Sequence, residues 1–296
     1  MSKELLFEIG TEEIPAAFLT KAISDIEDLA RKSFDENRIT HTGINVLATP
    51  RRLCLHIAEV SEKQEDQTIE KLGPAKKAAF DEKGNPSKAA LGFARGQGMD
   101  ISQLETVTTE KGDYLAARKT ISGKYTAALL PDILTKLVTS IPFRKSMRWA
   151  DYELRFARPI HWLLALYGSE IIPLHLESLT SANCSYGHRF SSPAPFSVSD
   201  FADYEQKTRQ NFVIVNPAER RKIILEEAQR AAAEVGGKIF YTDDLLDTVT
   251  FIVEFPVIIR GNFDREFLQV PKEVLTTTMI SHQKYFPVTD PNGKLL

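Results

Sequence analysis

The sequence opens with Leu5-Leu6-Phe7-Glu8-Ile9-Gly10-Thr11-Glu12-Glu13-Ile14-Pro15, a stretch that passes from one kind of secondary structure to another. Residues 5–9 form a short, apolar-rich stretch, which is typical of a strand. From Ala16 to about Glu36, apolar residues recur every three or four positions, which predicts an amphipathic helix. Thr11 is the expected N-cap of this helix, followed by acidic residues in its first turn. The fold therefore begins with a strand that leads into a long helix.

Further along the chain, strands and helices follow one another without regular alternation. Strands are predicted at residues 44–47, 53–60, 104–109, 114–121, 160–167, 171–176 and 212–215, and helices at 87–94, 127–138, 200–210, 217–235 and 271–280. This order predicts an α+β fold with mixed, mainly antiparallel sheets and packed helices, rather than a parallel doubly wound sheet. The Ser/Pro-rich stretch Ser191–Ser199 predicts two lobes: an N-terminal α+β lobe over residues 1–190 and a second α+β lobe over residues 191–296.

The last residues predict a hairpin with an incomplete second arm. Tyr285–Val288 leads into the turn signal Asp290-Pro291-Asn292-Gly293, and Lys294–Leu296 would begin the returning strand. We therefore expect the second lobe to be truncated at its C-terminal end, within a fragment of a longer polypeptide. The alternative is a natural, frayed C-terminus.

Composition excludes several classes of protein. The 296 residues carry a formal net charge of −3, so any nucleic-acid contact must come from a local basic patch. Two cysteines exclude a disulfide framework and fit the reducing cytoplasm. No apolar run approaches the ~20 residues that span a bilayer. We expect a cytoplasmic protein with no membrane partner.

Motifs for catalysis or metal binding are missing from the sequence. Gly92, Gly96 and Gly98 have the wrong spacing and context for a dinucleotide-binding fingerprint, and no phosphate-binding loop is present. Cys184 and His188 are four residues apart but have no further ligands at suitable spacing, whereas a zinc site needs about four. We therefore expect no metal site and no catalytic residue.

Basic residues interleaved with aromatic residues are the most distinctive feature. Arginine binds phosphates and flat rings stack on unpaired bases, so this pattern favours RNA binding. The predicted RNA-binding residues are Arg51, Arg52, Lys76, Lys77, Arg95, Arg144, Lys145, Arg148, Trp149, Arg155, Arg158, His188, Arg189, His282 and Lys284. The alternative is structural, since Trp149, Phe156 and Trp162 could fill a core and buried arginines often brace loops.

Several of these segments together resemble one known family. The matching segments are residues 5–15, 48–53, 73–75, 92–95, 147–149, 155–162, 187–190 and 282–288. In this order they resemble the N-terminal portion of the β subunit of the bacterial heterotetrameric (α2β2) glycyl-tRNA synthetase. Part of the family's N-terminal half is similar to the B3/B4 module of the phenylalanyl-tRNA synthetase β subunit, so the resemblance implies a B3/B4-like second lobe.

The resemblance implies a role in ATP-dependent glycylation of tRNA(Gly). In that family the α subunit forms glycyl-adenylate, and ATP and Mg are used by the holoenzyme, while the β subunit contributes tRNA binding and subunit assembly. The implied partners are the α subunit and tRNA(Gly), with no DNA. No catalytic residue or cofactor falls on these 296 positions, and the fragment alone should not activate glycine. The alternatives are a self-contained RNA-binding or RNA-modifying protein and an interaction scaffold whose arginines are structural.

Overall fold

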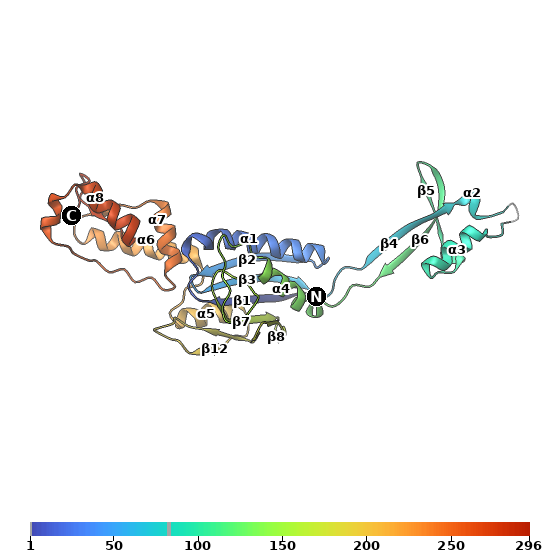
Figure 1. Ribbon diagram of the computed structural model, residues 1–296, viewed down its shortest axis with the longest axis horizontal. Coiled ribbons are helices and arrows are strands. Elements are labelled where there is room, and N and C mark those ends of the chain that lie inside the picture. Colours follow the sequence, from blue (N-terminus) through green and yellow to red (C-terminus); the bar gives the residue numbers. More distant parts are fainter. Residues whose placement is uncertain (1, 82–83) are drawn as a thin grey trace. The chain divides into compact units, whose positions relative to one another are not determined.

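The computed structural model describes residues 2–81 and 84–296 (Figure 1). Two compact units divide the chain: a main unit of residues 1–62 and 126–296, and an inserted unit of residues 63–125. The inserted unit begins just after β3 (Arg52–Ser61) and ends just before α4 (Thr126–Ser140). This division does not coincide with the lobe boundary that we place after residue 190, and that boundary stays a prediction.

A five-stranded sheet forms the centre of the main unit. Its strands, in spatial order, are β2 (His41–Thr49), β3 (Arg52–Ser61), β1 (Ser2–Thr11), β7 (Ile160–Tyr167) and β8 (Glu170–Ile171). Each neighbouring pair is antiparallel. The predicted strands at residues 5–9, 53–60 and 160–167 are therefore confirmed, and so is the α+β class with mainly antiparallel sheets.

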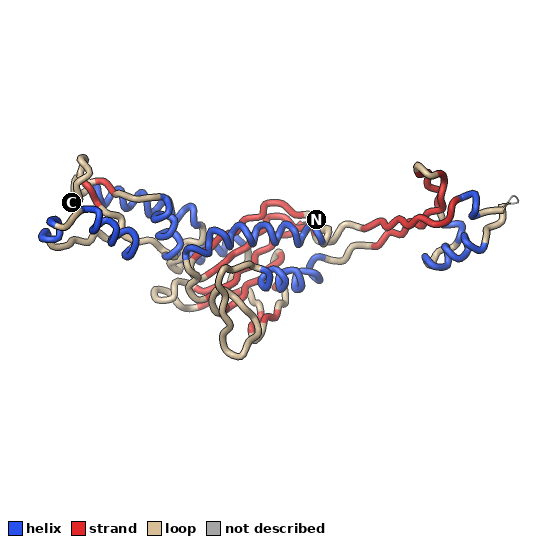
Figure 2. Tube along the Cα trace, turned by 45° about the horizontal axis from the view of Figure 1, so that its top comes forward, coloured by secondary structure: helices blue, strands red, loops and turns tan. Residues whose placement is uncertain are grey.

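Helices cover both faces of this sheet. On one face, Leu5, Phe7 and Ile9 of β1 belong to the core that includes α1 (Ala16–Glu36) and α4 (Thr126–Ser140). On the other face, Leu6 packs in a second core with Tyr204 of α5 (Phe201–Gln210). This separation follows from the alternation of side chains along a strand. Figure 2 shows α1 as a long helix that lies along the strands.

Helix α1 has the predicted bounds but not the predicted start. Its buried residues include Leu19, Ala22, Ile26, Ala30 and Phe34, which follow the expected helical spacing. The prediction that Thr11 caps it is wrong, because Thr11 is the last residue of β1 and Pro15 occupies the N-cap position. The Thr11 hydroxyl donates to the Glu12 carbonyl instead.

The C-terminal part of the main unit is mostly helical. It contains α6 (Pro217–Ala233), α7 (Asp243–Ile252), α8 (Lys272–Thr277) and the short antiparallel pair β13 (Lys238–Ile239) and β14 (Val288–Thr289). The predicted turn after β14 is confirmed by the bond from the Asp290 amide to the Lys294 carbonyl, at 2.8 Å. The strand predicted at residues 212–215 is wrong: this segment is irregular.

Arg220 of α6 holds that irregular segment in place. Its fully buried guanidinium donates to the carbonyls of Ile214 and Val215, and to Ala48 on β2 at 2.7 Å. Burial lowers the pKa of Arg220 to about 10. The carbonyls that a strand partner would have paired are satisfied by this side chain instead, which explains why no strand forms.

Four further short strands lie between β8 and α5. They are β9 (His175–Leu176), β10 (Leu179–Thr180), β11 (Cys184–Tyr186) and β12 (Pro195–Ser197). They form two antiparallel pairs, β9 with β10 and β11 with β12. Strand β11 supplies residues to the site described below.

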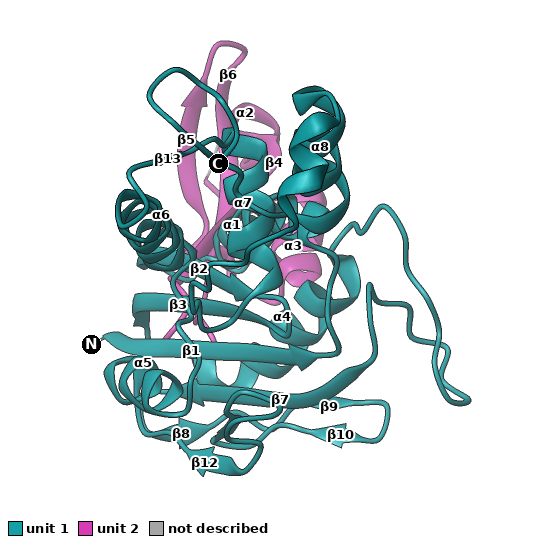
Figure 3. Cartoon of the chain, turned by 90° about the vertical axis from the view of Figure 1, so that its left-hand side faces the viewer, with its two compact units in different colours: residues 1–62, 126–296 teal, residues 63–125 magenta. Residues whose placement is uncertain are grey.

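The inserted unit has its own small sheet (Figure 3). Its strands, in spatial order, are β4 (Gln67–Ala75), β6 (Gly112–Ile121) and β5 (Glu105–Thr109). In the sequence, α2 (Lys76–Ala79), α3 (Lys88–Gln97) and the 3-10 helix Ile101–Gln103 lie between β4 and β5. The predicted hairpin of β5 and β6 is confirmed. Its core is small: a cluster of the buried residues Ala79, Ala90 and Leu115, against which Phe80, Ile101 and Leu104 pack.

Candidate functional site

Three segments in which the predicted RNA-binding residues and aromatic residues gather, residues 49–52, 155–162 and 186–190, meet at one cavity in the main unit. The cavity measures about 400 Å³ and is lined by Arg51, His161, Trp162, Tyr186, Gly187, Arg189 and Pro193. These residues come from the β2–β3 turn, from β7, and from the end of β11 and the segment after it. Residues as far apart in the chain as Arg51 and Pro193, 142 positions, thus form one site.

The strand register explains how they meet. Gly10 of β1 is paired with Arg52 on β3 and with Trp162 on β7. Because Gly10 has no side chain, the Trp162 indole lies across it: a Cβ atom there would be 1.8 Å from Trp162 Cε2. Glycine at this position is therefore a requirement of the close approach.

A buried network of polar side chains underlies the cavity. The fully buried carboxylate of Glu8 accepts hydrogen bonds from Trp162 Nε1 at 2.5 Å, from Ser185 Oγ at 2.7 Å and from the Tyr204 hydroxyl. Burial raises the pKa of Tyr204 well above its ordinary value, so the phenol stays protonated and donates. Glu8 thus links β1, β7, β11 and α5.

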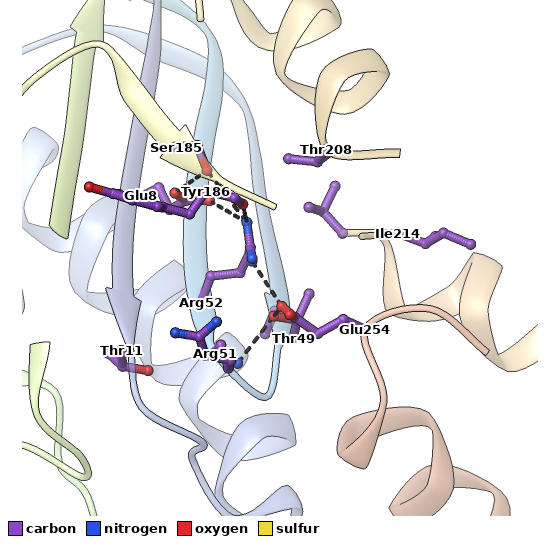
Figure 4. A network of polar contacts seen from close by, with 12 residues as sticks. Glu8, Thr11, Thr49, Arg51, Arg52, Ser185, Tyr186, Thr208, Ile214 and Glu254 are labelled. Atoms are coloured by element: carbon purple, nitrogen blue, oxygen red, sulfur yellow. Dashed lines mark hydrogen bonds and ion pairs between the residues drawn. The ribbon is translucent and has the colours of Figure 1, made fainter. Parts of the chain in front are cut away.

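Arg52 joins this network to the C-terminal helices (Figure 4). Its Nε donates to Glu254 Oε1 at 3.0 Å, its Nη1 donates to the Tyr186 carbonyl at 2.9 Å, and Nη1 lies 3.6 Å from Glu8 Oε2. Burial alone would lower the pKa of Arg52, but the carboxylates of Glu254 and Glu8 outweigh burial and raise it. Although predicted to bind RNA, Arg52 is fully buried and braces the fold.

An exposed network lies at the rim of the same cavity. Arg189 Nη1 pairs with Glu13 Oε1 and, at 3.4 Å, with Glu12 Oε2. His161 Nε2 lies 2.9 Å from Glu12 Oε1. Partial burial tends to raise the pKa of Glu13, but its bond from Arg189 helps to hold that pKa below the ordinary value. The hydrogen bond to Glu13 raises the pKa of Arg189.

Arg51 lies between the two networks. Its side chain is 13% exposed, and its guanidinium carbon lies 5.7 Å from the centre of the Trp162 ring. Its Nε is buried and has no hydrogen-bond partner among residues 2–81 and 84–296, with Glu13 Oε1 at the long distance of 4.0 Å. Arg51 lines the cavity and therefore keeps one donor that the fold does not use.

The loop of residues 141–159, between α4 and β7, carries the densest predicted cluster. Backbone bonds between Met147 and Phe156, at 2.8 and 3.2 Å, draw its two halves together. Arg144, Lys145 and Arg155 are exposed, and none of them has a carboxylate partner in the part of the chain that the structure describes. We call these three residues the loop cations.

The other predicted residues of this loop are less free. Arg148 pairs with Glu153 at 3.1 Å, and half-buried Arg158 donates to the Ala157 carbonyl at 2.8 Å. Trp149 is half-buried and lines a second cavity of about 200 Å³. His161 lines both cavities, so the two are neighbours.

The remaining predicted residues lie neither at the 400 Å³ cavity nor in the loop of residues 141–159, except His188, which is next to Gly187 of the cavity lining. Lys76, Lys77 and Arg95 are exposed on the inserted unit. His188 is half-buried, and its Nδ1 accepts weak bonds from the amides of residues 190 and 191. His282 is exposed in the short π-helix Thr278–Gln283 that follows α8, and half-buried Lys284 donates to the Ser281 carbonyl at 3.0 Å.

The sequence did not single out Glu8, Ser185, Tyr204 or Glu254 as a unit. One signal was available, because Glu8 is the only charged residue between Leu5 and Ile9. A carboxylate within a buried strand needs donors nearby. Its partners are up to 196 positions away, so the pattern predicts that donors exist but does not say which residues they are.

No group of three or more histidine, cysteine or acidic residues that could hold a metal ion occurs among the described residues. Within the same ranges, none of the helices is long and apolar enough to cross a membrane.

Comparisons with known proteins agree on one family. A family model described as glycyl-tRNA synthetase beta subunit matches residues 5–296. The chain is 57% identical over 296 residues to the glycine–tRNA ligase beta subunit of Syntrophus aciditrophicus (strain SB), and 49% identical to that of Geobacter sp. (strain M21). Each match covers 100% of this chain and 43% of the relative. The chain thus spans less than half the length of these relatives.

Proposed function

Because this chain belongs to the glycyl-tRNA synthetase beta subunit family, as its motifs predicted, we propose that it contributes tRNA binding and subunit assembly to the ATP-dependent glycylation of tRNA(Gly). Glycine activation then takes place on a companion α subunit, in the cytoplasm. The ATP and Mg²⁺ of the reaction are then used by the assembled enzyme.

The loop cations carry this proposal. Residues 144–158 contain five lysines and arginines but two acids, Asp151 and Glu153, in a chain whose net charge is −3. Glu153 neutralises Arg148, which leaves Arg144, Lys145 and Arg155 exposed and without carboxylate partners in the described ranges. Exposed cations of this kind bind RNA phosphates and release counterions.

A salt titration tests this assignment. The variant Arg144→Ala/Lys145→Ala/Arg155→Ala would be made in the full-length β subunit assembled with its companion subunit. Losing three phosphate contacts should lower the slope of log K against log salt by about 2 to 3 and raise the KM for tRNA(Gly). Glycine-dependent pyrophosphate exchange should stay unchanged, because that step needs no tRNA.

A matched control removes three other exposed cations of the main unit. Lys21, Arg31 and Arg230 each pair with a carboxylate on their own helix, so their replacement by alanine should leave the salt slope unchanged. Equal slopes for both triple variants would contradict the proposal. A loss of pyrophosphate exchange would instead make the loop a subunit contact, and a lower melting temperature would make its cations structural.

A further inference from the structure

We propose that the 400 Å³ cavity binds a single 5′-phosphorylated nucleoside unit, with the phosphate on Arg51 and Arg189 and the base against Tyr186. That the unit comes from an RNA strand rests on the proposed function. The cavity itself is a site separate from the loop cations.

Two guanidinium groups supply the anion-binding side. Arg51 and Arg189 both line the cavity, and His161 adds a third nitrogen donor at its wall. The buried Nε of Arg51 lacks a hydrogen-bond partner within residues 2–81 and 84–296. The fold therefore does not use every donor of Arg51, and guanidinium groups bind oxyanions through charge-assisted hydrogen bonds.

An aromatic wall supplies the second half of the site. Half-buried Tyr186 lines the cavity and packs on Trp162 with ring centroids 4.9 Å apart. Trp162 is held from below, because Nε1 is bonded to Glu8 and the guanidiniums of Arg51 and Arg52 lie near its ring. A fixed aromatic wall beside two arginines suits an unpaired base with its phosphate.

The volume fits one such unit. Small-molecule cavities commonly measure about 300 to 1,000 Å³, and this cavity, at about 400 Å³, lies near the lower end. Adding a side chain to Gly187 would bring a Cβ atom within 2.2 Å of the Ser192 carbonyl oxygen. The backbone wall at this point is therefore tightly packed and can keep the shape of the cavity.

The rim carboxylates act as internal counterions. Glu13 pairs with Arg189 and lies 4.0 Å from Arg51 Nε, so the same carboxylate faces both phosphate-binding groups. A phosphate that enters must displace it. Removing the charge of Glu13 should therefore tighten binding of an anion, whereas removing either arginine should weaken it.

Tryptophan fluorescence provides a direct test. The chain has two tryptophans, so in a Trp149→Phe background Trp162 is the only reporter, and it lies in the cavity wall. Adenosine 5′-monophosphate, cytidine 5′-monophosphate, adenosine and inorganic phosphate would each be titrated into the 296-residue chain. The monophosphates should change the Trp162 emission and bind at least about fivefold tighter than phosphate or adenosine.

Variants in the same background assign the contacts. Arg189→Ala and Arg51→Lys should each weaken monophosphate binding by about tenfold, and Glu13→Gln should tighten it by about two- to fivefold. Arg230→Ala should change nothing, because Arg230 is exposed on α6 and pairs with Glu227. Equal affinity of all variants, or monophosphates that bind no better than phosphate, would overturn the proposal.

Two further titrations test whether the nucleotide comes from an RNA strand, and distinguish failure of the cavity proposal from failure of the proposed function. An unstructured RNA tetranucleotide of A and C should bind at least as tightly as the monophosphates; exclusion of the tetranucleotide would contradict an RNA source. The triple variant of the loop cations should bind monophosphates normally. If that variant loses tRNA binding while Trp162 responds to no nucleotide, the cavity proposal fails and the proposed function stands.

Discussion

Two clusters of the same composition lie near Trp162, one in the protein interior and the other exposed at the cavity rim. Arg52 pairs with Glu8 and Glu254 in the interior, where all three side chains are at most 5% exposed. Arg189 pairs with Glu12 and Glu13 at the cavity rim, where the side chains are 33–48% exposed. Each cluster has one arginine and two glutamates. The difference teaches that burial, rather than residue type, decides whether such a cluster holds the fold or stays available to a ligand.

The physical reason is the cost of an unpaired charge. Removing one partner of a buried ion pair leaves a charge without water or a counterion, whereas an exposed charge is hydrated again. The two clusters should therefore respond very differently to the same substitution.

The largest effect is expected from Arg52→Ala. This change leaves Glu8 and Glu254 buried and without their cation, so the free energy of unfolding should fall by about 3–5 kcal/mol. Urea denaturation followed by circular dichroism measures it. A loss below about 1 kcal/mol would show that water reaches these carboxylates, and would remove the contrast between the clusters.

A smaller effect is expected from Gly10→Ala, which changes the strand between the two clusters. The new methyl group would overlap the Trp162 indole, at 1.8 Å from Cε2. We expect a loss of about 1–3 kcal/mol and a shifted Trp162 emission spectrum in the Trp149→Phe background. Gly96→Ala is the matched control, since a Cβ atom there meets nothing within 4 Å. Unchanged stability of Gly10→Ala would mean that the indole can move aside freely.

The smallest effect is expected from Arg189→Ala, at about 1 kcal/mol or less, because the pair is largely exposed. Its size depends on pH. The pKa of Glu13 is lowered in the folded state, so the contribution of the pair is complete above the ordinary value of 4.5 and is lost as the pH falls through the lower, folded-state pKa. Urea denaturation between pH 7 and pH 3 should therefore show the variant and the parent converging at low pH. A constant difference would mean that Arg189 acts by packing.

Local patterns predicted much of the fold. The apolar spacing in α1 and the turn between β5 and β6 are local signals, and both predictions are confirmed. Two local predictions failed where distant groups intervened. Thr11 ends a strand because β1 extends to pair with Ile160 on β7, and residues 212–215 are irregular because Arg220 takes the carbonyls of Ile214 and Val215.

The candidate site was predicted in pieces. The sequence marked residues 49–52, 155–162 and 186–190 as separate basic–aromatic segments, and the sheet register places one part of each at the same cavity or in the network beneath it. Whether Arg144, Lys145 and Arg155 bind RNA stays a prediction, although their exposure without carboxylate partners in the described ranges favours them over Arg148 and Arg158.

The sequence by itself determined the family, the opening strand and helix, and the places where arginines gather, because motifs and periodicity are properties of neighbouring residues. Only the tertiary structure decided the different roles of Arg51 and Arg52. These adjacent residues alternate in direction as β3 begins, so one lines the cavity while the other reaches Glu254, 202 positions away. A contact over that distance depends on how sheet and helices pack together, and no local pattern contains that information.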